Sequence, residues 1–155
     1  MTCFSVQNNL KVLHMQLAER EYASVAADFR EVSMRDHTKL RAFELADDLA
    51  VAIYRLTRDF PKDEIYGITS QMRRAAVSVP SNIVEGAARE SESEYLRFLE
   101  IAFGSLRELP CQFSLSQRLG YVQNTLDSSC EPLLVEAGKV LAALIRSLRS
   151  PRQTP

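Results

Sequence analysis

The chain of 155 residues contains no tryptophan, and aromatic residues make up only 8% of it. This composition argues against an extensive base-stacking platform. Five glycines and six prolines are too few for a collagen-like, low-complexity or linker-rich protein. With 46% hydrophobic and 25% charged residues, the chain has the composition and length of one ordinary globular domain.

An excess of basic residues is also missing, since the formal net charge is −1 and the isoelectric point is near 6.1. Proteins that coat DNA usually carry a strong basic excess. A nucleic-acid surface on this chain therefore has to come from local clustering of cations or from the assembly of several subunits.

The chain has neither the cysteine pattern of a disulfide framework or zinc site nor the apolar run of a membrane span. Its three cysteines, Cys3, Cys111 and Cys130, are widely spaced, and no C-x-x-C pair occurs. No apolar run reaches the roughly 18 residues that cross a bilayer, and the first 21 residues make a poor signal peptide. We therefore expect reduced thiols, no membrane association and a cytoplasmic protein.

Catalytic and metal-binding motifs are absent as well. There is no H-E-x-x-H, G-x-S-x-G or glycine-rich phosphate loop, and His14 and His37 lie outside the apolar patterns of the helices. Glu85 and Glu108 would suit a di-iron bundle only with Glu-x-x-His motifs on two helices, which the chain lacks. The sequence thus predicts no enzymatic activity, no bound metal and no cofactor.

What the chain does contain is four segments with apolar residues at three- and four-residue steps, at about 38–58, 68–87, 91–120 and 128–149. The apolar stripes of the first three segments are Phe43, Ala46, Leu49, Ile53 and Leu56; Met72, Ala75, Ala76, Val79 and Ile83; and Tyr95, Leu99, Ala102, Leu106, Leu109 and Phe113. This spacing is typical of amphipathic helices, and no alternation typical of strands competes with it. Short connections between such helices predict an all-α fold, an antiparallel up-and-down four-helix bundle over residues 37–150.

The two ends of the chain are expected to lie outside this bundle. Residues 1–36 form an extension that is either disordered or contains a short helix through Leu10, Leu13 and Leu17, and residues 151–155 form a frayed tail. One hypothesis is that Met34 is the natural start, which an N-terminus at Met1 in the mass spectrum of the native protein would refute.

Local signals predict several helix ends. Ser91 followed by Glu94 predicts a capping box, and Gly120 predicts the end of the third helix. Ser128 with Glu131 is expected to cap the fourth helix, with Pro132 in its first turn. The apolar stripe of the fourth helix is predicted to consist of Leu133, Ala137, Val140, Leu141, Leu144 and Leu148.

Pro80 stands in the middle of the second predicted helix, where it removes a hydrogen bond and presses on the carbonyl of Ala76 at a cost of about 3 kcal/mol. We expect a kink there, with the hydroxyls of Ser78 and Ser81 bonding freed backbone groups. This kink is either a bend accommodated by packing or the origin of a shaped subunit interface or ligand surface. Pro110 predicts a second bend, in the third helix.

Two further features of these helices lie off the main apolar stripes. Asn82 and Glu85, beside the kink, are expected to join a buried hydrogen-bond network that fixes the helix register. Phe98 and Ile101 form a second apolar set on the third helix. Because one stripe is enough to fill a bundle core, this second set predicts a contact between subunits.

A long run of residues resembles the hallmark of the small four-helix-bundle proteins encoded in intervening sequences of bacterial large-subunit ribosomal RNA genes. The matching residues are Tyr66-Gly67, Ser70-Gln71, Arg73-Arg74-Ala75-Ala76, Val79-Pro80-Ser81-Asn82-Ile83, Glu85-Gly86, Phe98-Leu99, Ala102, Gly104-Ser105-Leu106, Glu108-Leu109 and Leu119-Gly120-Tyr121. The resemblance covers about residues 39–148. Pro110-Cys111 departs from it, where a pair of the Glu-Thr type is usual.

This family is similar to the accessory protein of diversity-generating retroelements, a ring of five bundles that binds nucleic acid and a reverse transcriptase. The resemblance therefore implies a homopentamer with a link to RNA or DNA, and a protein partner within a ribonucleoprotein. It implies no catalysis.

Four arginines, Arg73, Arg74, Arg89 and Arg97, are the candidates for nucleic-acid binding, because forked guanidinium groups suit phosphate oxygens. The alternative is that they pair with the acidic residues Asp63, Glu85, Glu90 and Glu94. In a ring each free cation is repeated by symmetry, which forms a belt of positive potential. We thus expect a non-enzymatic homopentamer that binds RNA or DNA, with a protein-interaction scaffold as the alternative.

Overall fold

Four α-helices make up most of the chain that the computed structural model describes, residues 35–122 and 130–150. They are α2 (Arg41–Leu56), α3 (Ile68–Ala87), α4 (Glu92–Arg118) and α5 (Cys130–Arg149). Three short 3-10 helices flank α2, namely η1 (His37–Lys39), η2 (Thr57–Asp59) and η3 (Lys62–Glu64). No strand occurs within the described ranges, so the all-α prediction is confirmed.

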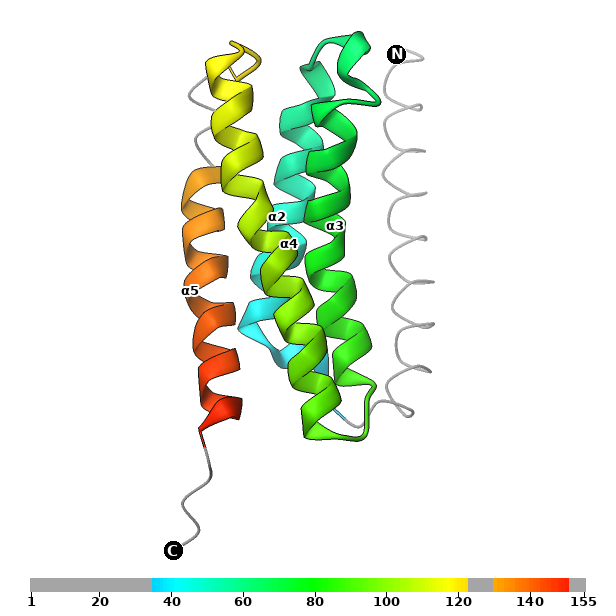
Figure 1. Ribbon diagram of the computed structural model, residues 1–155, viewed down its shortest axis with the longest axis vertical. Coiled ribbons are helices and arrows are strands. Elements are labelled where there is room, and N and C mark those ends of the chain that lie inside the picture. The colour runs from blue at the N-terminus through cyan, green and yellow to red at the C-terminus, as the bar shows by residue number, and fades with distance from the viewer. Residues whose placement is uncertain (1–34, 123–129, 151–155) are drawn as a thin grey trace, which may run out of the picture. The chain divides into compact units, whose positions relative to one another are not determined.

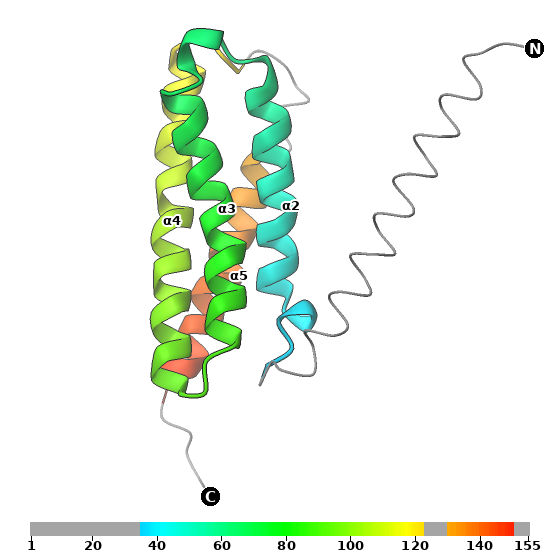
Figure 2. The same cartoon turned by 90° about the vertical axis from the view of Figure 1, so that its right-hand side faces the viewer.

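The helices run alternately up and down and pack side by side (Figures 1 and 2). The most extensive packing is between α3 and α4, while α2 packs against both α3 and α5, and α5 packs against α4. Each helix therefore has two neighbours around a shared core, which is the predicted antiparallel four-helix bundle. None of the helices in the described ranges is both long enough and apolar enough to cross a membrane.

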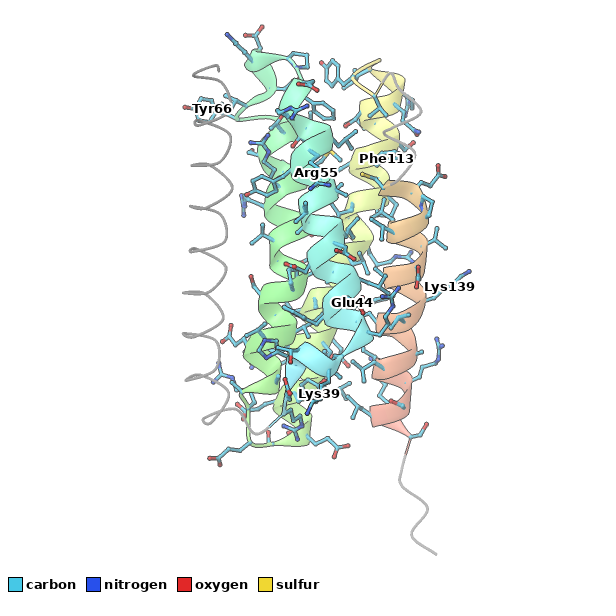
Figure 3. All side chains as sticks on the ribbon, turned by 180° about the vertical axis from the view of Figure 1, so that it is seen from behind. Lys39, Glu44, Arg55, Tyr66, Phe113 and Lys139 are labelled. Atoms are coloured by element: carbon cyan, nitrogen blue, oxygen red, sulfur yellow. The ribbon has the colours of Figure 1, made fainter. Side chains whose placement is uncertain are left out.

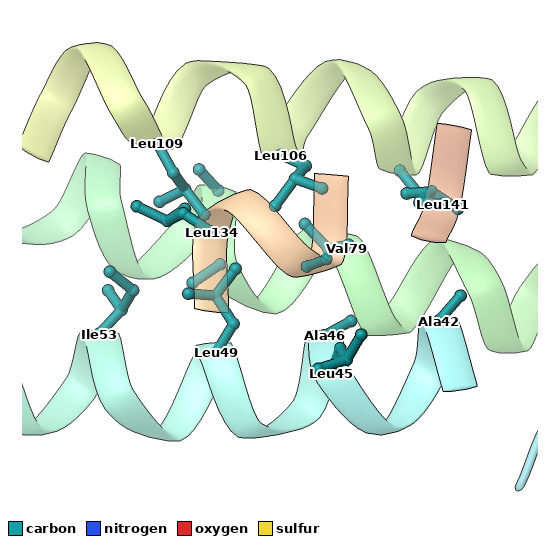
Figure 4. Packing of buried hydrophobic residues seen from close by; sticks show 14 of the residues in the cluster. Ala42, Leu45, Ala46, Leu49, Ile53, Val79, Leu106, Leu109, Leu134 and Leu141 are labelled. Carbon is teal, nitrogen blue, oxygen red and sulfur yellow. The ribbon is translucent and has the colours of Figure 1, made fainter. Parts of the chain in front are cut away.

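The core is filled by aliphatic side chains from all four helices. Leu49 of α2, Val79 of α3, Leu109 of α4 and Leu141 of α5 point into it at different levels along the bundle, and each is at most 1% exposed (Figure 4). Truncating such a side chain to alanine typically costs about 2–5 kcal/mol. The apolar stripes predicted for the first three helices supply most of this core.

The stripe predicted for α5 is correct at Ala137 and Leu141 but is otherwise displaced by about one residue. The buried residues of this helix are Cys130, Leu134, Ala137, Leu141 and Ile145. The predicted Leu133, Val140, Leu144 and Leu148 are only partly buried at its edge. The apolar arc of α5 is wide enough to contain two stripes, and its packing against both α2 and α4 decides which stripe faces the core.

The predicted ends of α4 are observed. At its start the N–H of Glu94 donates to Ser91 Oγ at 3.1 Å, and this hydroxyl donates to the Glu94 carboxylate at 3.2 Å. At its end Gly120 has φ of 75°, a left-handed conformation that favours glycine. The N–H groups of Gly120 and Tyr121 donate to the carbonyls of Gln117 and Ser116, which together form a Schellman motif.

Other predicted boundaries are only partly covered by the structure. Pro132 lies in the first turn of α5, as expected. The capping residue Ser128, the extension up to residue 34 and the tail 151–155 lie outside the described residues. Both Pro80 and Pro110 stand inside continuous helices, α3 and α4. Neither proline ends its helix, and a bend at each stays a prediction.

The backbones of α3 and α4 approach each other closely at Gly86. A Cβ atom at this position would lie 2.9 Å from the Cβ of Phe98 and 3.1 Å from a ring carbon of Tyr95. Gly86 itself is buried, so the lack of a side chain is what allows α4 to pack this closely against α3.

Candidate functional site

A hollow of about 700 Å³ runs along the outer side of α3 and reaches neighbouring parts of α2 and α4. We call it the α3 hollow. Its lining combines cations, hydroxyl groups and one carboxylate, and includes Tyr54, Thr69, Arg73, Arg74, Ser78 and Glu108. The hollow therefore brings together two of the four arginines that the sequence singled out.

Arg73 is held in place by the end of α2. Its Nε donates to Thr57 Oγ1 at 2.8 Å and its Nη2 donates to the carbonyl of Thr57 at 3.2 Å. The guanidinium carbon lies 4.9 Å from the centre of the Tyr54 ring, a cation–π contact. Thr57 is only 2% exposed, so these bonds fix a half-buried arginine to the core of the bundle. The acidic partners considered from the sequence are not the ones that hold Arg73.

Arg74, the next residue, is in a different situation. It is exposed at the hollow and, within the described residues, its guanidinium makes no hydrogen bond or ion pair. Arg97, on α4, is likewise exposed and unpaired in the part of the chain that the structure covers, but it does not line the hollow. The adjacent arginines therefore differ, in that Thr57 holds Nε and Nη2 of Arg73 whereas the whole guanidinium of Arg74 is available.

Arg89 is paired with an acidic residue, which was the alternative to nucleic-acid binding considered from the sequence. Its partner is Glu85, one helical turn earlier. Its guanidinium carbon also lies 4.8 Å from the centre of the Phe98 ring. Next to it, Arg35 donates to the carbonyl of Arg89 at 2.6 Å and covers the ring of Tyr95. Burial raises the pKa of Tyr95, and the positive charge of Arg35 opposes this rise. Arg89 is thus part of a packed corner where α3 ends, away from the hollow.

The polar network beside Pro80 is smaller than expected. The amide nitrogen of Asn82 donates to the carbonyl of Ser78 at 2.7 Å and to its hydroxyl at 3.0 Å. That hydroxyl pairs with the hydroxyl of Ser105 on α4 at 2.9 Å, instead of bonding a carbonyl freed by the proline. Glu85 is exposed and pairs with Arg89, so its expected place in this network was wrong. Ser81 is also exposed, and in the described chain its hydroxyl does not make the expected bond to a freed backbone group.

Replacing Asn82 with leucine is expected to lower the free energy of unfolding by about 1 kcal/mol, because both bonds to Ser78 are removed. The change also removes a polar constraint on how α3 sits against α4, so we expect weaker assembly. Urea unfolding and native mass measure the two effects. Ser81→Ala is the matched control and should change neither; unaltered melting and oligomer mass in Asn82→Leu would contradict the prediction.

The second apolar set on α4 is divided by the structure. Phe98 is half-buried beneath Arg89, whereas Ile101 is 43% exposed. Sequence reasoning missed a larger group of exposed apolar side chains near the hollow, namely Tyr54, Ile65, Tyr66 and Val77. Tyr54 and Val77 lie on helices but off the buried stripes, and Ile65 and Tyr66 lie in a loop. In the sequence, only these positions indicate that the side chains are exposed.

The loop before α3 is fastened by Glu64. One oxygen of its carboxylate accepts the N–H of Ile68 at 3.0 Å, and the other accepts the hydroxyl of Tyr121 at 3.3 Å. Burial, together with the negative charge of Glu64, raises the pKa of Tyr121. This carboxylate therefore joins the start of α3 to the segment that follows α4.

Metal ligands do not gather in the part of the chain that the structure describes. Within it, no three His, Cys, Asp or Glu side chains lie close enough together to hold an ion. The α3 hollow instead contains two arginines and several hydroxyl groups against the single carboxylate of Glu108, so that cations outnumber anions and the balance suits an anionic ligand.

Comparisons with known proteins agree with this architecture. The model of a family described as 23S rRNA-intervening sequence protein matches residues 38–143. A crystal structure of a protein of unknown function from the S23 ribosomal protein family of Bacteroides thetaiotaomicron is similar, with a TM-score of 0.61. The two chains are 22% identical, and the match covers 68% of this chain and 95% of the other, a similarity that shows the fold alone. None of the curated proteins compared with the chain matches it.

Proposed function

Since the chain belongs to the family of 23S rRNA-intervening sequence proteins, we propose that it is a non-enzymatic homopentamer that binds RNA or DNA. The observation that carries this proposal is the α3 hollow, where Arg74 is exposed and unpaired within the described chain beside the fixed guanidinium of Arg73. Arginines in such positions suit the phosphate oxygens of a nucleic-acid backbone.

Assembly is needed for this proposal because the chain is nearly neutral. A single copy with a net charge of −1 attracts a polyanion only weakly. Symmetry repeats Arg74, and also Arg97, in every subunit, so that several phosphates are bound at once. Ile101, exposed on α4, is the candidate contact between subunits, with the half-buried Phe98 beside it in a lesser role.

Arg74→Ala is expected to weaken RNA binding about tenfold at ~0.1 M salt for each phosphate that the variant no longer binds, and to flatten the dependence of affinity on salt. Fluorescence anisotropy against salt concentration measures both effects. Arg146→Ala is the matched control, since it removes the same charge from an exposed position on α5, which does not line the hollow. Equal affinities of the two variants would count against the proposal.

The purified protein gives a second test. Its native mass reports the number of subunits, and its absorbance ratio at about 260 and 280 nm reports nucleic acid that is purified with it. A monomer at high concentration would remove the symmetry on which the proposal depends.

A protein-interaction scaffold is the second candidate function. It is favoured by the exposed apolar side chains at the hollow, of which Tyr54 is 47%, Ile65 54% and Val77 42% exposed. Apolar groups of this kind suit a protein partner, such as one within a ribonucleoprotein. A stable oligomer that retains no RNA or DNA even at low salt would favour this alternative.

A further inference from the structure

We propose that the α3 hollow accepts single-stranded nucleic acid in preference to a duplex, with bases stacked on Tyr66 and Tyr54 beside phosphates held by Arg73 and Arg74. This inference rests on the nucleic-acid binding proposed above and adds the form of the ligand. Although the chain is poor in aromatic residues, Tyr54 lines the hollow and Tyr66 directly follows the lining residue Ile65.

Tyr66 is the most exposed of the large apolar side chains in the described chain, at 91%. It extends from the loop before α3, away from the helices (Figure 3). Tyr66 does not itself line the hollow, but it directly follows Ile65, which does, so the backbone that carries its ring passes the hollow. An exposed aromatic face is what an unpaired base requires for stacking.

The loop that carries Tyr66 is well fixed. The N–H of Ile65 donates to the carbonyl of Lys62 at 3.1 Å, and the N–H of Gly67 donates to the carbonyl of Glu64 at 3.0 Å. The carboxylate of Glu64 holds both the first residue of α3 and Tyr121. Tyr66 therefore gives up little backbone freedom when a base stacks on it, which favours binding.

Tyr54 supplies a second stacking element, and it lines the hollow directly. The ring of Tyr54 is half-exposed and lies against the guanidinium of Arg73. Among the described residues, Thr57 occupies only Nε and one hydrogen of Nη2, so the N–H groups of Nη1 remain for a phosphate. Guanidinium planes and aromatic rings both stack on bases.

The spacing of these groups fits a short stretch of one strand. Arg73 and Arg74 lie five and six residues after the start of α3, which is about 8–9 Å along the helix axis. Two or three stacked nucleotides span a similar length at about 3.4 Å each. In a duplex the base faces are covered by their neighbours, so Tyr66 reaches them only in a single strand.

Binding of a labelled single-stranded RNA, the matching single-stranded DNA and a duplex of equal length tests this inference at about 0.1 M salt. We expect both single strands to bind about tenfold more tightly than the duplex. Comparison of the single-stranded RNA with the single-stranded DNA shows which of the two nucleic acids the hollow prefers. Tyr66→Ala should weaken single-strand binding about tenfold without changing duplex binding. Tyr66→Phe is the matched control and should bind like the unmodified protein, because it keeps the ring.

The outcomes separate this inference from the proposed function. If the duplex binds as tightly as the single strands, or if Tyr66→Ala binds them like the unmodified protein, the stacking inference is overturned while nucleic-acid binding stands. If none of the three nucleic acids binds, both are overturned. Unchanged melting of Tyr66→Ala, expected for an exposed loop residue, ensures that a decrease in affinity does not come from unfolding.

Discussion

Gly86→Ala is expected to lower the free energy of unfolding by about 2 kcal/mol, although alanine is the better helix former. The added methyl group would lie 2.9 Å from the Cβ of Phe98, and 3.3 Å from the carbonyl oxygen of Tyr95. Both are atoms close to the backbone of α4, which cannot turn aside as the end of a long side chain can. The two helices must therefore move apart where their packing is closest.

Gly104→Ala is the matched control for this prediction. Gly104 is also inside a helix, but no described atom lies within 4 Å of a Cβ built on it, apart from its own helix backbone and chain neighbours. Its replacement should raise the free energy of unfolding by about 0.5–1 kcal/mol through helix propensity alone. In urea unfolding, the changes in the free energy of unfolding of the two variants should have opposite signs. A stabilised Gly86→Ala variant would show that the α3–α4 contact is looser than described.

Arg73→Ala is expected to lower the free energy of unfolding by about 2–3 kcal/mol, since hydrogen bonds made by a charged group contribute about 1.5–3 kcal/mol. The change removes both bonds to Thr57 and the contact with the Tyr54 ring. It also leaves the carbonyl of Thr57 without this donor at the junction of α2 and η2. Arg73→Lys keeps the charge but not the fork of donors, and should recover only part of the stability.

Arg74→Ala is the matched control, because it changes the same residue type one position along the chain. Its exposed guanidinium has no partner within the described residues, so the free energy of unfolding should change by less than about 0.5 kcal/mol. Chemical denaturation of both variants measures the difference. Equal stabilities would mean that the bonds of Arg73 do not persist in solution. The contrast also makes Arg74 the better position at which to test nucleic-acid binding.

The helices and most of the core were predictable from the sequence because helical periodicity depends on each segment alone. Leu49, Met72 and Leu99 stand on predicted stripes and are completely buried. The stripe of α5 was misplaced because its apolar arc is wide, and only contact with α2 and α4 selects the face that is buried. Leu134 and Ile145 were missed for this reason.

The candidate site was less predictable, since four arginines of equal chemistry have different neighbours in the folded chain. Arg73 meets Thr57, 16 residues earlier, and Arg89 meets the ring of Phe98 on the next helix. The spacing of residues within one helix cannot predict these contacts, because each contact joins two different elements. The exposure of Tyr66 was also hidden, because a loop tyrosine packs inward in one fold and outward in another.

The carboxylate of Glu64 has a consequence for motion at its end of the molecule. One side chain accepts a backbone proton from the first turn of α3 and a phenolic proton from Tyr121, 57 residues further along the chain. A displacement of the Glu64 side chain would lengthen both bonds at once, because they share this one carboxylate. We therefore expect loss of this carboxylate to loosen both segments, so that in Glu64→Ala deuterium should enter the amides of the first turn of α3 and of the segment at Tyr121 faster than in the unmodified protein.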